Sequence, residues 1–161
     1  MQRFVNEYEY TQDILEESIG VWWDRKFRDG YRTMFVVFIL IAVLSIVLRR
    51  PVFLLFEFCP LFGIALFRFN RKKAIQIERE RMDILFRGLP ISYRVEVGED
   101  ISTISPKNTN RIQFSDVENY TETRNLIVLF IRGSMTLPLV KNGFKEGTKE
   151  DFMSLLAGKV K

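Results

Sequence analysis

Few residues of this chain could carry out catalysis. The sequence has no histidine and a single cysteine, Cys59, which falls inside a long apolar run. A Ser-His-Asp triad, a Cys-His nucleophile and a disulfide framework are therefore excluded within the chain, as is a metal site built from His or Cys. The sequence also has no glycine-rich phosphate loop. We predict that the protein is not an enzyme and binds no metal or cofactor.

Glu57 is the only acidic residue in the apolar run, which extends from residue 34 to residue 67. An ionisable side chain at membrane depth is a candidate functional site by default. Glu57 could line an ion or proton path in an oligomer of small transporter or channel subunits, or form a helix–helix contact in an oligomer. It could also pair with Arg50 or reach outward to the membrane interface, and we favour this structural role.

A cluster of basic residues directly after the apolar run could bind anions. Residues 68–89 hold seven Lys or Arg and three Asp or Glu, an excess of +4. Such an excess beside a membrane predicts contact with anionic lipid headgroups. The candidate contact residues are Arg68, Arg71, Lys72 and Lys73. Residues 90–161, with ten basic and nine acidic residues, lack the basic surface of a nucleic-acid binder.

The element that positions these residues is a predicted helical hairpin in a lipid bilayer. Residues 31–48 and 52–69 are two apolar segments of 18 residues each, separated by Arg49-Arg50-Pro51. Each segment would be roughly 27 Å long as a helix, against a hydrocarbon core of about 30 Å. We expect two transmembrane helices. The alternatives are a re-entrant hairpin that does not cross, and a soluble helical hairpin buried in a core.

The flanking charges predict the orientation of the hairpin. Four basic residues precede the first predicted span, four follow the second, and the turn carries two. The four that precede it are Arg25, Lys26, Arg28 and Arg32. The positive-inside rule then places both termini in the cytoplasm. Trp22 and Trp23 lie on a predicted helix over residues 12–28 that ends at Asp29-Gly30. They either anchor the membrane interface or pack against the β domain.

The soluble parts of the chain predict a small antiparallel β domain. A strand is expected over residues 3–10, and from residue 91 short apolar runs alternate with turn residues. Residues 125–131 are apolar on both faces, and Thr148 is placed to cap a final helix. Five or six strands closed by a C-terminal helix give the outline of a PH-like domain. The fold class is an α+β membrane protein, divided at residues 1–30, 31–69, 70–89 and 90–161.

One motif resembles a known family. The run from Ile112 to Thr123 is similar to the (I/L)-x-(W/Y)-S-D-I-x-x-V-x-E-T core of the YcxB-like proteins, and the apolar run 126–130 and Leu137-Pro138 follow in the family's order. The motif residues, for which we expect structural roles, are Ser115, Asp116, Val117 and Pro138. The Ser-Asp pair is expected to cap a turn between strands.

The resemblance implies a bacterial inner-membrane protein with a cytoplasmic PH-like domain and no assigned enzyme activity. The function we expect is a non-enzymatic integral membrane protein that presents a binding module to an anionic lipid headgroup or a protein segment. A homo-oligomer is compatible with this expectation. An oligomeric transporter or channel subunit built from the hairpin is the alternative.

Overall fold

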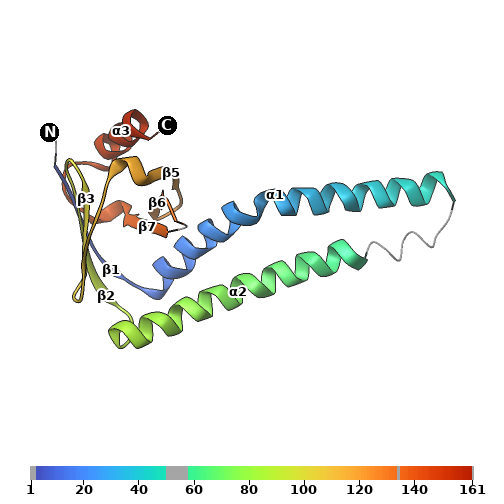
Figure 1. Cartoon of the computed structure of the whole chain (residues 1–161), viewed down its shortest axis with the longest axis horizontal. Helices are drawn as coiled ribbons and strands as arrows, with labels where there is room; N and C mark the ends of the chain where they lie inside the picture. The colour runs from blue at the N-terminus through green and yellow to red at the C-terminus, as the bar shows by residue number, and fades with distance from the viewer. Residues whose placement is uncertain (1–2, 50–57, 134, 161) are drawn as a thin grey trace. The chain divides into compact units, whose positions relative to one another are not determined.

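The computed structural model describes residues 3–49, 58–133 and 135–160 (Figure 1). The chain has an α+β architecture of long helices and antiparallel strands. It divides into two compact units, which we call the sheet unit (residues 1–22 and 78–161) and the hairpin unit (residues 23–77). The α+β class expected from the sequence is therefore confirmed.

The sheet unit contains two antiparallel sheets. The five-stranded sheet has the order β4-β3-β2-β1-β8, and the three-stranded sheet has the order β5-β6-β7. The strands of the first sheet are β1 (Phe4–Tyr10), β2 (Ile91–Val97), β3 (Ile101–Ile104), β4 (Thr109–Ile112) and β8 (Phe144–Glu146). Those of the second are β5 (Val117–Glu122), β6 (Leu126–Ile131) and β7 (Met135–Val140).

Strand β1 confirms the strand expected near the N-terminus, and its place in the sheet is informative. All seven of its residues pair with β2, from Phe4 opposite Val97 to Tyr10 opposite Ile91. On its other side β1 pairs with β8. From the sequence we expected this strand to belong to a separate N-terminal segment. It lies instead inside the five-stranded sheet. The two long helices, at residues 12–47 and 58–86, are therefore inserted between two adjacent, paired strands.

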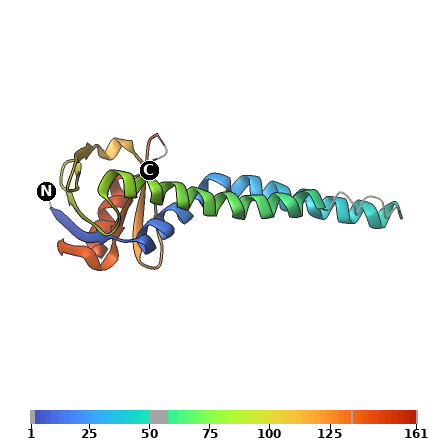
Figure 2. The same ribbon diagram turned by 90° about the horizontal axis from the view of Figure 1, so that it is seen from below.

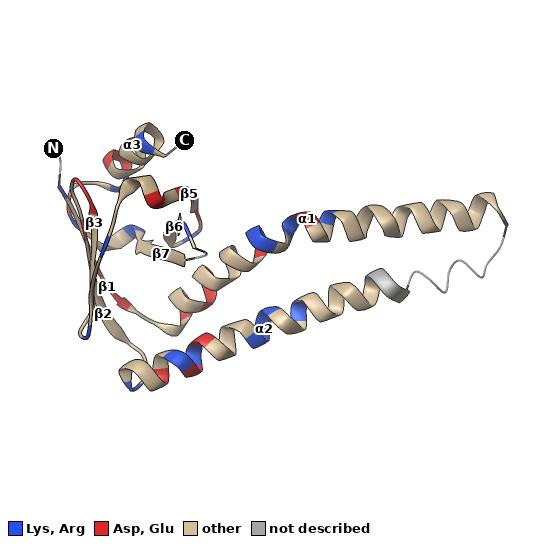
Figure 3. Ribbon diagram, viewed as in Figure 1, with Lys and Arg blue, Asp and Glu red and all other residues tan. Residues whose placement is uncertain are grey.

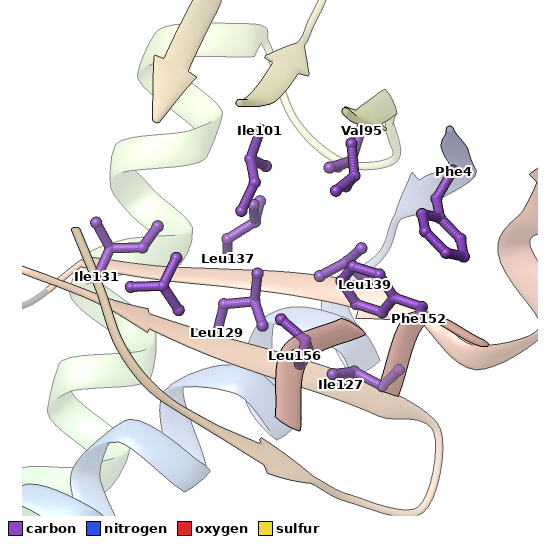
Figure 4. Close-up of a cluster of buried hydrophobic side chains, with 12 residues drawn as sticks. Phe4, Val95, Ile101, Ile127, Leu129, Ile131, Leu137, Leu139, Phe152 and Leu156 are labelled. Carbon is purple, nitrogen blue, oxygen red and sulfur yellow. The ribbon is translucent and has the colours of Figure 1, made fainter. Parts of the chain in front are cut away.

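The main core lies between the two sheets (Figure 4). Alternation of side chains along each strand supplies one apolar face per sheet, because successive residues point to opposite sides. The C-terminal helix α3 (Lys149–Lys159) adds Phe152 and Leu156, which are both fully buried. The Thr148 hydroxyl accepts a hydrogen bond of 3.1 Å from the backbone N–H of Asp151. This confirms the predicted cap and final helix.

Strand β6 is buried on both faces, as its uniformly apolar sequence predicted. Its outward side chains, Leu126, Val128 and Phe130, form a second cluster. This cluster is covered by Ile14, Val21 and Trp22, which belong to the first turns of helix α1 (Gln12–Val47). Glu17 of the same helix accepts hydrogen bonds from the backbone and side-chain nitrogens of Asn125, at 3.1 and 3.0 Å. Residues 12–22 thus form a third layer of the sheet unit.

The two sheets are joined by polar contacts between β1 and β7. The Asn6 amide, 1% exposed, donates to the Val140 carbonyl at 2.8 Å and accepts from the Val140 N–H at 3.2 Å. A Cβ at Gly143 would lie 2.8 Å from the Glu7 carbonyl oxygen and 3.1 Å from the Asn6 Oδ1. Glycine at position 143 therefore lets the chain pass close to the hydrogen bonds between Asn6 and Val140.

Helix α1 corrects one expectation from the sequence. We predicted that the first helix ends at Asp29-Gly30, but α1 continues as one helix from Gln12 to Val47. A glycine within a helix costs only about 1 kcal/mol relative to alanine. Packing of α1 on both sides of Gly30, through Phe27 and Tyr31 against Phe67, outweighs that cost. Gly30 also has space around it, because a Cβ added there would meet no atom within 4 Å.

The hairpin unit consists of two antiparallel helix segments, one from α1 and one from α2 (Phe58–Phe86). Both views show them side by side and running in opposite directions (Figures 1 and 2). Asp24 lies opposite Arg71, Phe27 and Tyr31 both contact Phe67, and Met34 lies against Gly63. Half-buried residues recur at steps of three and four along both segments, as in an antiparallel coiled-coil seam.

By length and composition, α1 is the one described helix able to cross a membrane. The second predicted span, residues 52–69, lies partly outside the described residues. Helix α2 continues to Phe86, and the next two residues, Arg87 and Gly88, have positive φ angles of 64° and 108°. The helix expected to follow the second apolar segment is thus part of α2.

Candidate membrane-interface site

The hairpin unit brings two groups of basic residues to the same level. The register of α1 against α2 places the basic segment of residues 25–32 partly opposite that of residues 68–73, with residues 25–28 facing residues 68–71. We call these eight residues the basic collar: Arg25, Lys26, Arg28, Arg32, Arg68, Arg71, Lys72 and Lys73. Asp29 is the acid within these segments and Asp24 directly precedes the first, so eight positive and two negative charges leave +6. Figure 3 shows the two blue segments on the paired helices.

The predicted anion-binding side chains of α2 differ in their surroundings. Arg68, Lys72 and Lys73 are exposed. Arg71 is half-buried, and its Nε lies 3.8 Å from Asp24 Oδ1. Arg71 therefore lies at the contact between the two helices, while its three basic neighbours are exposed to solvent. From the sequence, the four basic residues of α1 predicted only the orientation of the hairpin in the membrane. Local sequence does not show which residues face each other across a hairpin.

Aromatic side chains pack beside the collar. Trp23 contacts Phe27 with ring centroids 4.4 Å apart, and both contact Phe67 at 5.8 Å. Tyr31 packs edge-on against Phe67 at 5.2 Å. Rings with one polar edge are typical of the headgroup level of a membrane. Trp22, by contrast, packs on the outer cluster of strand β6. Of the two environments predicted for the tryptophans, Trp22 therefore has the one against the β domain, and a place for Trp23 at the membrane interface stays a prediction.

Beyond the collar, the hairpin unit carries an exposed apolar surface. No charged residue occurs on α1 from Thr33 to its end at Val47. Leu40 is 61% exposed and Ile46 is 76% exposed. On α2 the first described turns expose Phe58 and Phe62 at 67% and 65%. A surface of this kind is unfavourable in water and favourable in hydrocarbon.

Glu57, the predicted intramembrane polar site, lies outside the described residues. The motif residues lie in the sheet unit. Ser115 and Asp116 belong to a 3-10 turn, Phe114–Asp116, between β4 and β5. In that turn the Asp116 N–H donates to the Gln113 carbonyl at 3.0 Å. Val117 is buried and begins β5, and Pro138 lies buried within β7.

A tyrosine cluster lies where β1 and β2 approach the helices of the sheet unit. Tyr8 stacks on Tyr93 at 6.0 Å, and its hydroxyl donates to the Pro138 carbonyl at 2.5 Å. Burial raises the pKa of Tyr8 above its usual value and raises the pKa of Tyr10 to about 12. These hydroxyls therefore remain neutral at physiological pH. The Tyr8 hydroxyl joins the two sheets, which is a structural role.

One charged cluster was not foreseen from the sequence. Glu122 lies 2.8 Å from the Lys141 ammonium and 2.7 Å from the Lys149 ammonium. Hydrogen bonds from Lys141 and Lys149 lower the pKa of Glu122 to about 2. The three residues come from β5, the turn after β7 and helix α3, so their meeting depends on the tertiary fold. Among residues 3–49, 58–133 and 135–160, no three His, Cys, Asp or Glu side chains gather as metal ligands.

Comparison with known families gives one match. The family model described as YcxB-like protein matches residues 98–156. Searches of curated proteins and of solved structures each found no match. The matched stretch runs from the β2–β3 turn into helix α3 and contains all four motif residues. The resemblance seen in the motif is confirmed over this stretch.

Proposed function

We propose that this chain is an integral membrane protein that crosses the bilayer twice and holds its sheet unit at the membrane surface as a binding module. The observation that carries the proposal is the β1–β2 ladder, which brackets the hairpin unit. Tyr10 and Ile91 are paired neighbours, so they lie on the same side of any membrane. The chain between them must cross an even number of times.

The pairing of β1 with β2 supports a second membrane helix. Helix α1 has one apolar stretch suited to crossing. If α1 crosses, the chain must cross back before Ile91. The apolar segment of residues 52–69 provides the return, and its described part, from Phe58 onward, runs antiparallel beside α1. A single-span protein is incompatible with a paired β1 and β2.

The basic collar supports a cytoplasmic location for both termini. The collar, with six excess positive charges, flanks the apolar segments on the sides that lead to β1 and β2 in the sequence. The turn between the segments carries only Arg49 and Arg50. The positive-inside rule counts charges close to the spans, so the collar side is the cytoplasmic side. The resemblance to the YcxB-like family supports the bacterial inner membrane as the location.

The architecture of the sheet unit supports a PH-like binding module. Two antiparallel sheets enclose one core, and a C-terminal helix contributes to that core. Strands β1 to β4 form one meander and β5 to β7 the other, so the hairpin unit is an insertion in the loop between the first two strands. We assign this module a non-enzymatic role in binding.

Cysteine labelling in intact cells tests this topology. Cys59 is first replaced by serine, and single cysteines are then introduced as Arg49→Cys at the turn and Lys145→Cys on the sheet unit. With a membrane-impermeant maleimide, the cysteine at position 49 should react in intact cells, and the one at position 145 only after lysis. Labelling of neither position before lysis would indicate a re-entrant hairpin. Recovery of the chain in the supernatant after ultracentrifugation without detergent would refute membrane insertion.

A further inference from the structure

We propose that the collar binds the phosphate of an anionic phospholipid between Arg28 of α1 and Arg68 of α2. The proposal rests on the membrane insertion proposed above and names the lipid that the hairpin unit recognises. The sequence alone pointed to α2, whereas the structure indicates a site shared by both helices.

The register places the two arginines at one level. Phe67 contacts both Phe27 and Tyr31, so the residue after Phe67 lies level with the residue after Phe27. Both phenylalanines are half-buried seam residues. In an antiparallel helix pair, positions that directly follow equivalent seam residues lie on the same flank of the seam. Arg28 and Arg68 are these positions.

In the described part of the hairpin unit, negative charge near the two arginines is limited to Asp24, which lies four residues before Arg28 and 3.8 Å from Arg71, and to Asp29. Between Phe58 and Ile77, α2 contains no Asp or Glu, and Lys72 lies one helical turn after Arg68. Like charges four residues apart disfavour a helix unless a counter-ion is present. On α1, Arg28 approaches Asp29 at 4.0 Å, with side chains 65% and 88% exposed. An ion pair this open is weak and leaves the guanidinium available.

The chemistry of the site favours a lipid over a free anion. Two guanidinium groups present planar sets of N–H donors, which match the oxygens of a phosphate. Leu66 and Phe69, close to Arg68 in the sequence, are 43% and 64% exposed. Acyl chains attached to the phosphate would cover this apolar surface, and an inorganic phosphate would not. A phospholipid with a single net negative charge, such as phosphatidylglycerol, satisfies both parts of the site.

Native mass spectrometry of the full chain in detergent micelles tests the proposal. Phosphatidylglycerol or phosphatidylcholine is titrated into the micelles, and lipids that remain bound are counted. The double variant Arg28→Gln/Arg68→Gln should bind phosphatidylglycerol about 30-fold more weakly, or about 2 kcal/mol, from about 1 kcal/mol per basic residue. The matched control is Arg124→Gln/Arg132→Gln, which removes the same charge from exposed turns of the sheet unit. The control should bind like the wild type.

Three results would overturn the lipid site. Wild-type protein could bind both lipids equally, the control could lose as much affinity as the test variant, or inorganic phosphate could compete as strongly as the lipid. Alkaline carbonate extraction of cell membranes separates these results from a failure of the proposed function. If wild-type protein stays in the membrane pellet but shows no preference for phosphatidylglycerol, the lipid site alone is refuted. If the protein is extracted, the membrane insertion is refuted as well.

Discussion

Replacement of Asn6 by leucine should strongly destabilise the sheet unit. The two side chains are similar in size, so Asn6→Leu removes the amide without opening a cavity. The Val140 N–H and C=O, now bonded to Asn6 at 3.2 and 2.8 Å, would both lose their partner. Each unsatisfied buried backbone group costs about 1–3 kcal/mol, so the expected loss is about 2–6 kcal/mol. This is a large part of the roughly 5–15 kcal/mol that is typical of a domain.

Urea unfolding of the full chain in detergent micelles, followed by near-ultraviolet circular dichroism, measures this loss. The control is Asn142→Leu, because Asn142 is exposed on the turn after β7. Hydrogen exchange at the Val140 amide gives a local readout, and it should accelerate in Asn6→Leu alone. If Asn6→Leu costs no more than Asn142→Leu and leaves that amide protected, the contact between β1 and β7 does not hold the two sheets together.

Three further predictions concern the two units. Gly63→Leu should separate the helices of the hairpin unit, because the end of Met34 can move aside for a Cβ but a whole leucine side chain would need the space between the helices; disulfide crosslinking between cysteines introduced into the two helices would detect the loss. The stability that Glu122 contributes should be fully present above pH 4.5, its usual pKa, and should be lost as the pH falls towards 2. Thermal melting of wild type and Glu122→Gln at several pH values checks this. Replacement of residues 23–77 by about ten Gly and Ser residues, which span roughly 17 Å, should give a folded, water-soluble sheet unit with dispersed amide signals; an aggregated product would contradict the division into units.

The features that the sequence predicted well are those with a local cause. Thr148 caps α3 through a residue three positions later, and the uniform apolar character of β6 marks burial on both faces. The alternation along β1 correctly separates the face of Phe4 from that of Glu7. In each case the signal and the structure involve the same short stretch of chain.

The features that the sequence could not predict depend on distant partners. The position of β1 beside β2 joins residues that are more than 80 positions apart, and alternation along β1 says nothing about its neighbours. The same holds for the pairing of Asp24 with Arg71, which aligns the two halves of the collar. Continuation of α1 through Gly30 was missed for another reason: a local breaker signal was weaker than the packing of α1 on both sides.

Insertion of the hairpin between β1 and β2 links the stability of the two units. Residues 11–90 form the loop that the β1–β2 ladder closes. A flexible loop of this length would cost about 4 kcal/mol to close, from the logarithmic dependence on loop length. Two antiparallel helices remove most of that cost because they bring the ends of the loop together before the strands pair. A change that separates the helices, such as Gly63→Leu, should therefore also speed hydrogen exchange in β1, although position 63 lies outside the sheet unit. Unchanged exchange in β1 would show that the ladder closes without help from the hairpin.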